Sequence, residues 1–111
     1  MSTDFPSRLQ FVGEARVGRT VEARWIVRHP MESGLRVNDS GQRIPRNIIE
    51  QVWVRVNGEL VLEIEPGTGL SANPYLAFSL TVPSSAAVVV VEWRDDRGQT
   101  GRVQQVLQPL D

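Results

Sequence analysis

The sequence predicts an all-β protein, an immunoglobulin-like β-sandwich of about seven strands. Three observations support this: short segments alternate apolar with polar residues, turn-forming residues separate these segments, and no segment has the spacing of an amphipathic helix. A chain of 111 residues has the length of one domain. We therefore expect residues 1–111 to form a single domain, with its strand core at about residues 8–108.

The alternation is clearest at residues 21–28, where Trp25 falls on the apolar side and Ile26 is the one misfit among the polar positions. A weaker strand is expected before it, at residues 8–12. Five more follow at residues 51–57, 59–65, 75–82, 87–94 and 102–108. Turn residues separate these later strands at 57–58, 66–69, 83–85 and 95–98.

About twenty residues without a strand pattern connect the segments 21–28 and 51–57. A connection longer than roughly 12 to 15 residues is uncommon in a compact domain and is usually functional or disordered. This one contains the only histidine and three of the twelve cations, Arg36, Arg43 and Arg46. It is therefore a first candidate for a functional region.

Side-chain parity constrains the hairpin at Asn57-Gly58. A two-residue loop would place the aliphatic residues of the two flanking strands on opposite faces of the sheet. A three-residue loop with a glycine bulge pairs Val54 with Leu60 and brings these aliphatic residues to one core-facing side. The sequence therefore favours the three-residue loop.

An exposed apolar patch is the consequence of this register. It sets Trp53 opposite Val61 on the outer face of the sheet, and the strand at 87–94 adds Val88 and Val90 to the same face. A large apolar patch on a protein surface usually marks an interface with another protein. These four residues are the predicted partner-binding site.

Composition excludes several function classes. The net charge is −1 and the charges are interspersed, so we expect no nucleic-acid partner. There is no cysteine, which excludes thiolate chemistry, and no catalytic motif is present, so we expect neither an enzyme nor a cofactor. The longest apolar run, residues 86–91, is too short to span a bilayer, and residues 1–12 lack the features of a signal peptide.

His29 and Met31 admit two interpretations. With Glu32 close by, imidazole and thioether groups could bind a copper ion. The alternative is a hydrogen-bonded histidine at the end of a strand and a buried methionine, with no metal site, and this is the prediction we adopt. Asp95 and Asp96 lie in a turn, where aspartate is favoured because it binds nearby backbone amides.

Four further residues are candidates for contacts beside the long connection. Arg43 and Arg46 could bind an anion or a carboxylate in bidentate fashion. Asn73 opens the fifth strand in a turn, and Tyr75 has a polar tip that suits the rim of an interface.

Several motifs together resemble the SoxZ family, a cysteine-free subunit of the SoxYZ carrier of bacterial thiosulfate oxidation. They are HPMESG at 29–34, IPRNII at 44–49, NPY at 73–75 and WRDDRG at 93–98, and their order and spacing match over about residues 20–107. The resemblance implies a non-catalytic, periplasmic subunit that is exported with a SoxY-like partner and needs no signal peptide of its own. The partner carries the sulfur intermediate on a cysteine in a Gly-Gly-Cys-Gly-Gly arm.

For this chain the resemblance implies a heterodimer, or a heterotetramer, with a SoxY-like chain, and transient contacts with other Sox enzymes. The partner would bind Trp53, Val61, Val88 and Val90. The long connection would lie near the carrier arm, through His29, Met31, Glu32, Arg43, Arg46, Asn73 and Tyr75. The isolated chain could form a homodimer through its uncovered patch. The alternatives are a periplasmic copper-binding β-sandwich and a generic immunoglobulin-like interaction module.

Overall fold

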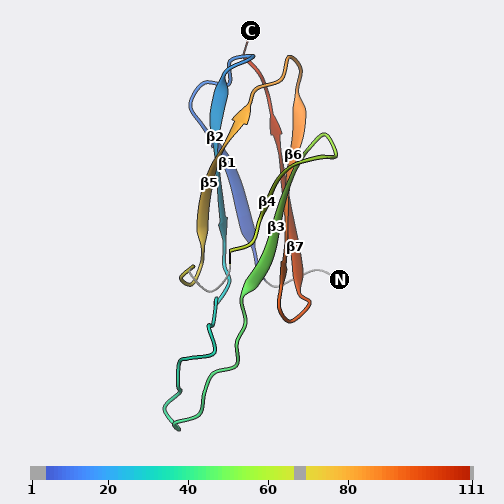
Figure 1. The fold of residues 1–111 in the computed structure, drawn as a ribbon. Coiled ribbons are helices and arrows are strands. Elements are labelled where there is room, and N and C mark those ends of the chain that lie inside the picture. Colours follow the sequence, from blue (N-terminus) through green and yellow to red (C-terminus); the bar gives the residue numbers. More distant parts are fainter. Residues whose placement is uncertain (1–4, 67–69, 111) are drawn as a thin grey trace.

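The computed structural model describes residues 5–66 and 70–110, and it contains two antiparallel sheets packed face to face (Figure 1). The three-stranded sheet has the order β1 (Ser7–Val12), β2 (Thr20–Val27), β5 (Tyr75–Thr81). The four-stranded sheet has the order β4 (Glu59–Ile64), β3 (Ile49–Val56), β6 (Ala87–Asp95), β7 (Thr100–Leu107). No described residue belongs to a helix, and hence none lies in a helix that could span a membrane.

The predicted immunoglobulin-like β-sandwich is confirmed. Strands β3, β6 and β7 share one sheet with β4, and β1, β2 and β5 form the other, as in sandwiches of this type. Each strand begins and ends within two residues of the predicted position. Most of the turn predicted at residues 66–69 lies outside the described residues.

Inward-facing residues of both sheets form the core, which is centred on two fully buried tryptophans, Trp25 of β2 and Trp93 of β6. In β2 every second residue is buried, which is the period expected when one face of a strand lies against a core. The Trp93 indole lies against Gly101, its partner on β7. A Cβ atom at Gly101 would be 2.4 Å from the indole ring, so only glycine fits this position without movement.

The predicted hairpin register between β3 and β4 is wrong. Asn57 and Gly58 both have positive φ, 50° and 84°, and they form a two-residue turn that pairs Val56 with Glu59. Such turns match the right-handed twist of the flanking strands. The parity conflict is instead resolved by an extra residue at Val61, where the register shifts within β4.

The long connection has no strand, as expected, but its two halves are bridged to each other and extend together from one end of the sandwich (Figure 1). We call residues 30–46 the finger. The backbone groups of Glu32 and Asn47 exchange two hydrogen bonds of 2.8 Å, and the amide of Ile44 donates to the Arg36 carbonyl at 2.9 Å. With the finger, the longest dimension of the molecule is 59 Å, compared with 26 and 19 Å in the other directions.

Candidate functional site

The predicted apolar patch lies on the outer face of the four-stranded sheet, but its composition differs from the prediction. Val61 and Val88 are exposed, as expected. Val90 is only 6% exposed, because it is flanked by Arg55 on β3 and Gln104 on β7. Val90 is therefore not part of an exposed patch, which is a correction to the sequence-based expectation.

Trp53 also lies in different surroundings from those predicted. It is opposite Glu63, not Val61, because the two-residue turn and the extra residue at Val61 each shift the register by one residue. Its Nε1 donates a hydrogen bond to Glu63 Oε2 at 3.0 Å, and the Arg94 guanidinium lies 5.7 Å from the ring centroid. Trp53 is thus partly covered by charged neighbours.

Two exposed apolar residues were missed. Val106 is 50% exposed and is the direct cross-strand partner of Val88. Leu60, which the predicted register placed in the core, lies opposite Arg55 and is exposed. Alternation within residues 102–108 could have identified Val106, because it falls on the polar side of that strand.

We call Leu60, Val61, Val88 and Val106 the apolar patch. It lies near the Asn57-Gly58 turn, and the Asn57 side chain fixes this end of the sheet by accepting a hydrogen bond of 2.9 Å from the Val88 amide. Arg55 lies level with Leu60, between Leu60 and Val90, and it forms an ion pair of 3.1 Å with Glu92, which lies nearer the finger along β6. The outer face thus has an apolar end next to a charged middle.

At the base of the finger, the His29 ring is completely buried and both of its nitrogens are hydrogen-bonded. Nδ1 accepts from the Met31 amide at 3.0 Å, so Nε2 carries the proton and donates to Asp95 Oδ2 at 3.1 Å. The Met31 sulfur accepts from the Ile49 amide at 3.3 Å. These contacts confirm the expected strand-end histidine, and they engage every atom with which His29 and Met31 would bind copper. The described part of the chain contains no cluster of three His, Cys, Asp or Glu side chains suited to a metal ion.

The turn between β6 and β7 also holds the finger. Asp95 Oδ1 accepts hydrogen bonds from the amides of Arg97 and Gln99, at 3.0 and 2.8 Å, which confirms the turn role expected for this residue. Asp96 Oδ1 accepts from the Ile48 amide at 3.1 Å, and Asp96 Oδ2 forms an ion pair with Arg46 at 3.1 Å. The sequence indicated a turn at these aspartates but not their contacts with the finger.

The other predicted residues of this region do not form one cluster. Glu32 forms a two-pronged contact with Arg36, and the hydrogen bonds from Arg36 lower the pKa of Glu32. Arg43 is exposed and lies farther along the finger, opposite Val37. The Asn73 amide donates to the His29 carbonyl at 2.8 Å, which places Asn73 at the base of the finger.

Tyr75 is exposed on the other sheet, at the start of β5. The residues predicted to lie near the carrier arm therefore fall into three groups. His29 and Met31 are buried at the base of the finger, Arg43 is exposed farther along it, and Tyr75 lies apart on the other sheet. Near the tip of the finger, Leu35 and Val37 are exposed, and Leu35 is the more exposed at 73%.

A family model described as "Sulphur oxidation protein SoxZ" matches residues 9–106. The chain belongs to the SoxZ family. This SoxZ-family chain therefore has a role in sulfur oxidation, and it works with partners within the Sox system. Comparison with curated proteins gave no match.

Among solved structures, the chain is similar to a superoxide reductase (neelaredoxin) from Ignicoccus hospitalis. The TM-score is 0.61 at 11% sequence identity, with 94% of this chain and 79% of that chain covered. At this identity the similarity shows a shared β-sandwich fold and nothing about activity.

Proposed function

We propose that this chain is the non-catalytic subunit of a carrier complex for sulfur compounds. In the proposed complex it forms a heterodimer with a SoxY-like chain, which holds the sulfur intermediate on its cysteine. The family match over residues 9–106 carries this proposal. The lack of cysteine agrees with it, because a second thiol near a loaded carrier cysteine could attack a persulfide or form a mixed disulfide.

The apolar patch is the proposed contact surface for the partner. Val88 and Val106 form an exposed cross-strand pair, and Leu60 and Val61 add two more apolar side chains at the same end of the sheet. Protein interfaces commonly combine an apolar centre with a charged rim, and the Arg55–Glu92 ion pair supplies part of such a rim. This patch replaces the partner-binding residues predicted from the sequence, which were Trp53, Val61, Val88 and Val90.

The finger joins β3 at one end, and the Asn57-Gly58 turn, near which the apolar patch lies, is at the other end of this strand (Figure 1). Eight residues of extended strand span roughly 25 Å, which is within the reach of one partner domain. A partner seated on the patch and extending past Trp53 would approach the base of the finger. We therefore propose that the finger lies close to the partner's mobile arm.

Co-expression with a SoxY-like chain that ends in Gly-Gly-Cys-Gly-Gly, followed by native mass spectrometry, tests the proposed heterodimer. Val88→Asp and Val106→Asp should each weaken the complex by more than about 2 kcal/mol, or roughly 30-fold in Kd, if these residues are buried anchors. Val12→Asp is the matched control, since Val12 is similarly exposed but lies on the other sheet. A wild-type chain that forms no complex would overturn the proposal.

The proposed place of action is the periplasm, reached by export together with the partner. Cell fractionation tests this directly. The chain should be found in the periplasm when the partner carries its signal peptide and should remain in the cytoplasm when that peptide is deleted. Periplasmic chain in both cases would contradict co-export.

A further inference from the structure

We propose that the outer face of the three-stranded sheet is a second interaction surface, which binds an acidic segment of another protein. We call Arg8, Arg24, Ile26, Arg28 and Tyr75 the basic face. It lies on the opposite side of the sandwich from the apolar patch, so a carrier subunit bound to that patch would leave it accessible.

One row of cross-strand neighbours forms the centre of this face. Ile26 of β2 lies opposite Arg8 of β1 on one side and opposite Tyr75 of β5 on the other. Ile26 and Tyr75 are 42% and 48% exposed, respectively. Ile26 is the residue that broke the alternation of its strand, and the structure shows that it faces outward, beside an exposed tyrosine.

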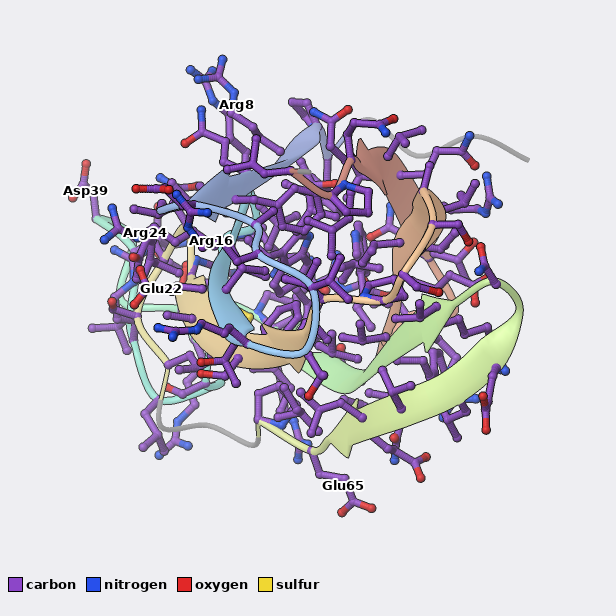
Figure 2. The ribbon with its side chains drawn as sticks, turned by 90° about the horizontal axis from the view of Figure 1, so that it is seen from above. Arg8, Arg16, Glu22, Arg24, Asp39 and Glu65 are labelled. Carbon is purple, nitrogen blue, oxygen red and sulfur yellow. The ribbon has the colours of Figure 1, made fainter. Side chains whose placement is uncertain are left out.

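The charges around this row are unbalanced. Arg24 forms an ion pair with Glu22, whereas Arg8 and Arg28 are exposed and form no ion pair with any described residue. Figure 2 shows Arg8 and Arg24 projecting on the side of β1 and β2 that faces away from the four-stranded sheet. Within the described part of the chain, the basic face therefore presents two uncompensated guanidinium groups beside an apolar side chain.

The surface is also concave at this point. A groove of about 400 Å³ is lined by Pro6, Ser7, Arg8, Ile26 and Arg28. The isoleucine and the two uncompensated arginines thus line one depression. An apolar side chain of a partner could lie on Ile26 while neighbouring carboxylates reach Arg8 and Arg28.

Charge complementarity identifies the occupant as an acidic protein segment. Guanidinium groups bind carboxylates with two parallel hydrogen bonds, and arginine and tyrosine are frequent anchors of protein interfaces. A nucleic acid would need a larger one-sided basic surface than this chain of net charge −1 provides. An anionic membrane is typically recognised by clusters of about four to eight cations, more than this face offers.

The test is an NMR titration of the full ¹⁵N-labelled chain with a twelve-residue peptide that has a central leucine flanked by glutamates. We expect saturable shifts confined to the amides of residues 7–8, 24–28 and 75–76. The same peptide with glutamines in place of the glutamates should bind at least tenfold more weakly. Vesicles containing phosphatidylglycerol and a twenty-nucleotide single-stranded DNA are the two competing probes.

Arg8→Glu combined with Arg28→Glu should weaken peptide binding at least tenfold, whereas Arg102→Glu on the opposite sheet should leave it unchanged. The spectra of the variants outside the basic face report whether the fold is intact. The proposal is overturned if the shifts are not localised, if the glutamine peptide binds equally well, or if the double variant retains its affinity. Tighter binding of the vesicles or the DNA than of the peptide would overturn the assignment to a protein partner.

Discussion

Replacing Asp95 with alanine should release the base of the finger and destabilise the whole domain. The Asp95 carboxylate is buried and accepts three hydrogen bonds, from His29 Nε2 at 3.1 Å and from the amides of Arg97 and Gln99 at 3.0 and 2.8 Å. It therefore connects the β6–β7 turn to the end of β2, from which the finger starts.

The expected loss in the free energy of unfolding depends on whether each hydrogen-bond donor can bind water once the carboxylate is removed. The His29 side chain is 0% exposed, so its N–H would be left buried without an acceptor, at a cost of about 1–3 kcal/mol. The Arg97 and Gln99 residues are exposed, so their amides can bind water, and each loss is about 0.5–1.5 kcal/mol. We expect a total of about 2–6 kcal/mol, which is the sum of these three losses.

Urea unfolding at pH 7 measures this loss, with Asp39→Ala as the control because Asp39 is exposed on the finger. The control should change the free energy of unfolding by less than about 0.5 kcal/mol. His29→Phe keeps a ring next to Phe5 and Trp93, and in a double-mutant cycle with Asp95→Ala it should give a coupling energy above about 1.5 kcal/mol. A loss below about 1 kcal/mol for Asp95→Ala, or additive effects in the cycle, would refute this role for the pair.

Three further variants probe the fold and the finger. Gly101→Ala places a methyl group 2.4 Å from the Trp93 indole and should destabilise the domain by about 1–3 kcal/mol in thermal unfolding; an unchanged Tm would contradict the packing. Gly58→Ala forces a Cβ at φ 84° and should cost about 1 kcal/mol, unless the hairpin turn differs from the one described. Hydrogen bonds from Arg36 lower the pKa of Glu32 below its ordinary value of 4.5, so their stabilising effect is present above that value and is lost as the pH falls through the lowered pKa. NMR titration of the Glu32 carboxyl should show this lowered pKa and its return toward 4.5 in Arg36→Gln; equal values in both proteins would rule out the contact.

The seven strands could be predicted because burial of one face imposes a period of two on each strand, as in β2. The hairpin register could not, because a bulge at the turn and a bulge at Val61 both satisfy the same side-chain parity. The choice between them depends on how the twist of the turn matches that of the strands. A bulge at the turn would place Leu60 in the core, whereas the bulge at Val61 leaves Leu60 exposed opposite Arg55.

The candidate site was only partly predictable for related reasons. Val88 followed from alternation, but the burial of Val90 depends on Arg55 and Gln104 from the two neighbouring strands. The anchor of the finger joins His29 to Asp95, which are 66 residues apart in the chain. Local sequence patterns contain no signal for such a contact.

Native mass spectrometry of the chain co-expressed with a SoxY-like chain tests the carrier-subunit proposal most directly. We expect a one-to-one heterodimer, or a dimer of such heterodimers, that dissociates into free chains when Val88 and Val106 are both replaced by aspartate. The Val12→Asp control should retain the complex. Wild-type chain found only as a monomer or homodimer, with both subunits folded and present at micromolar concentration, would contradict the proposal.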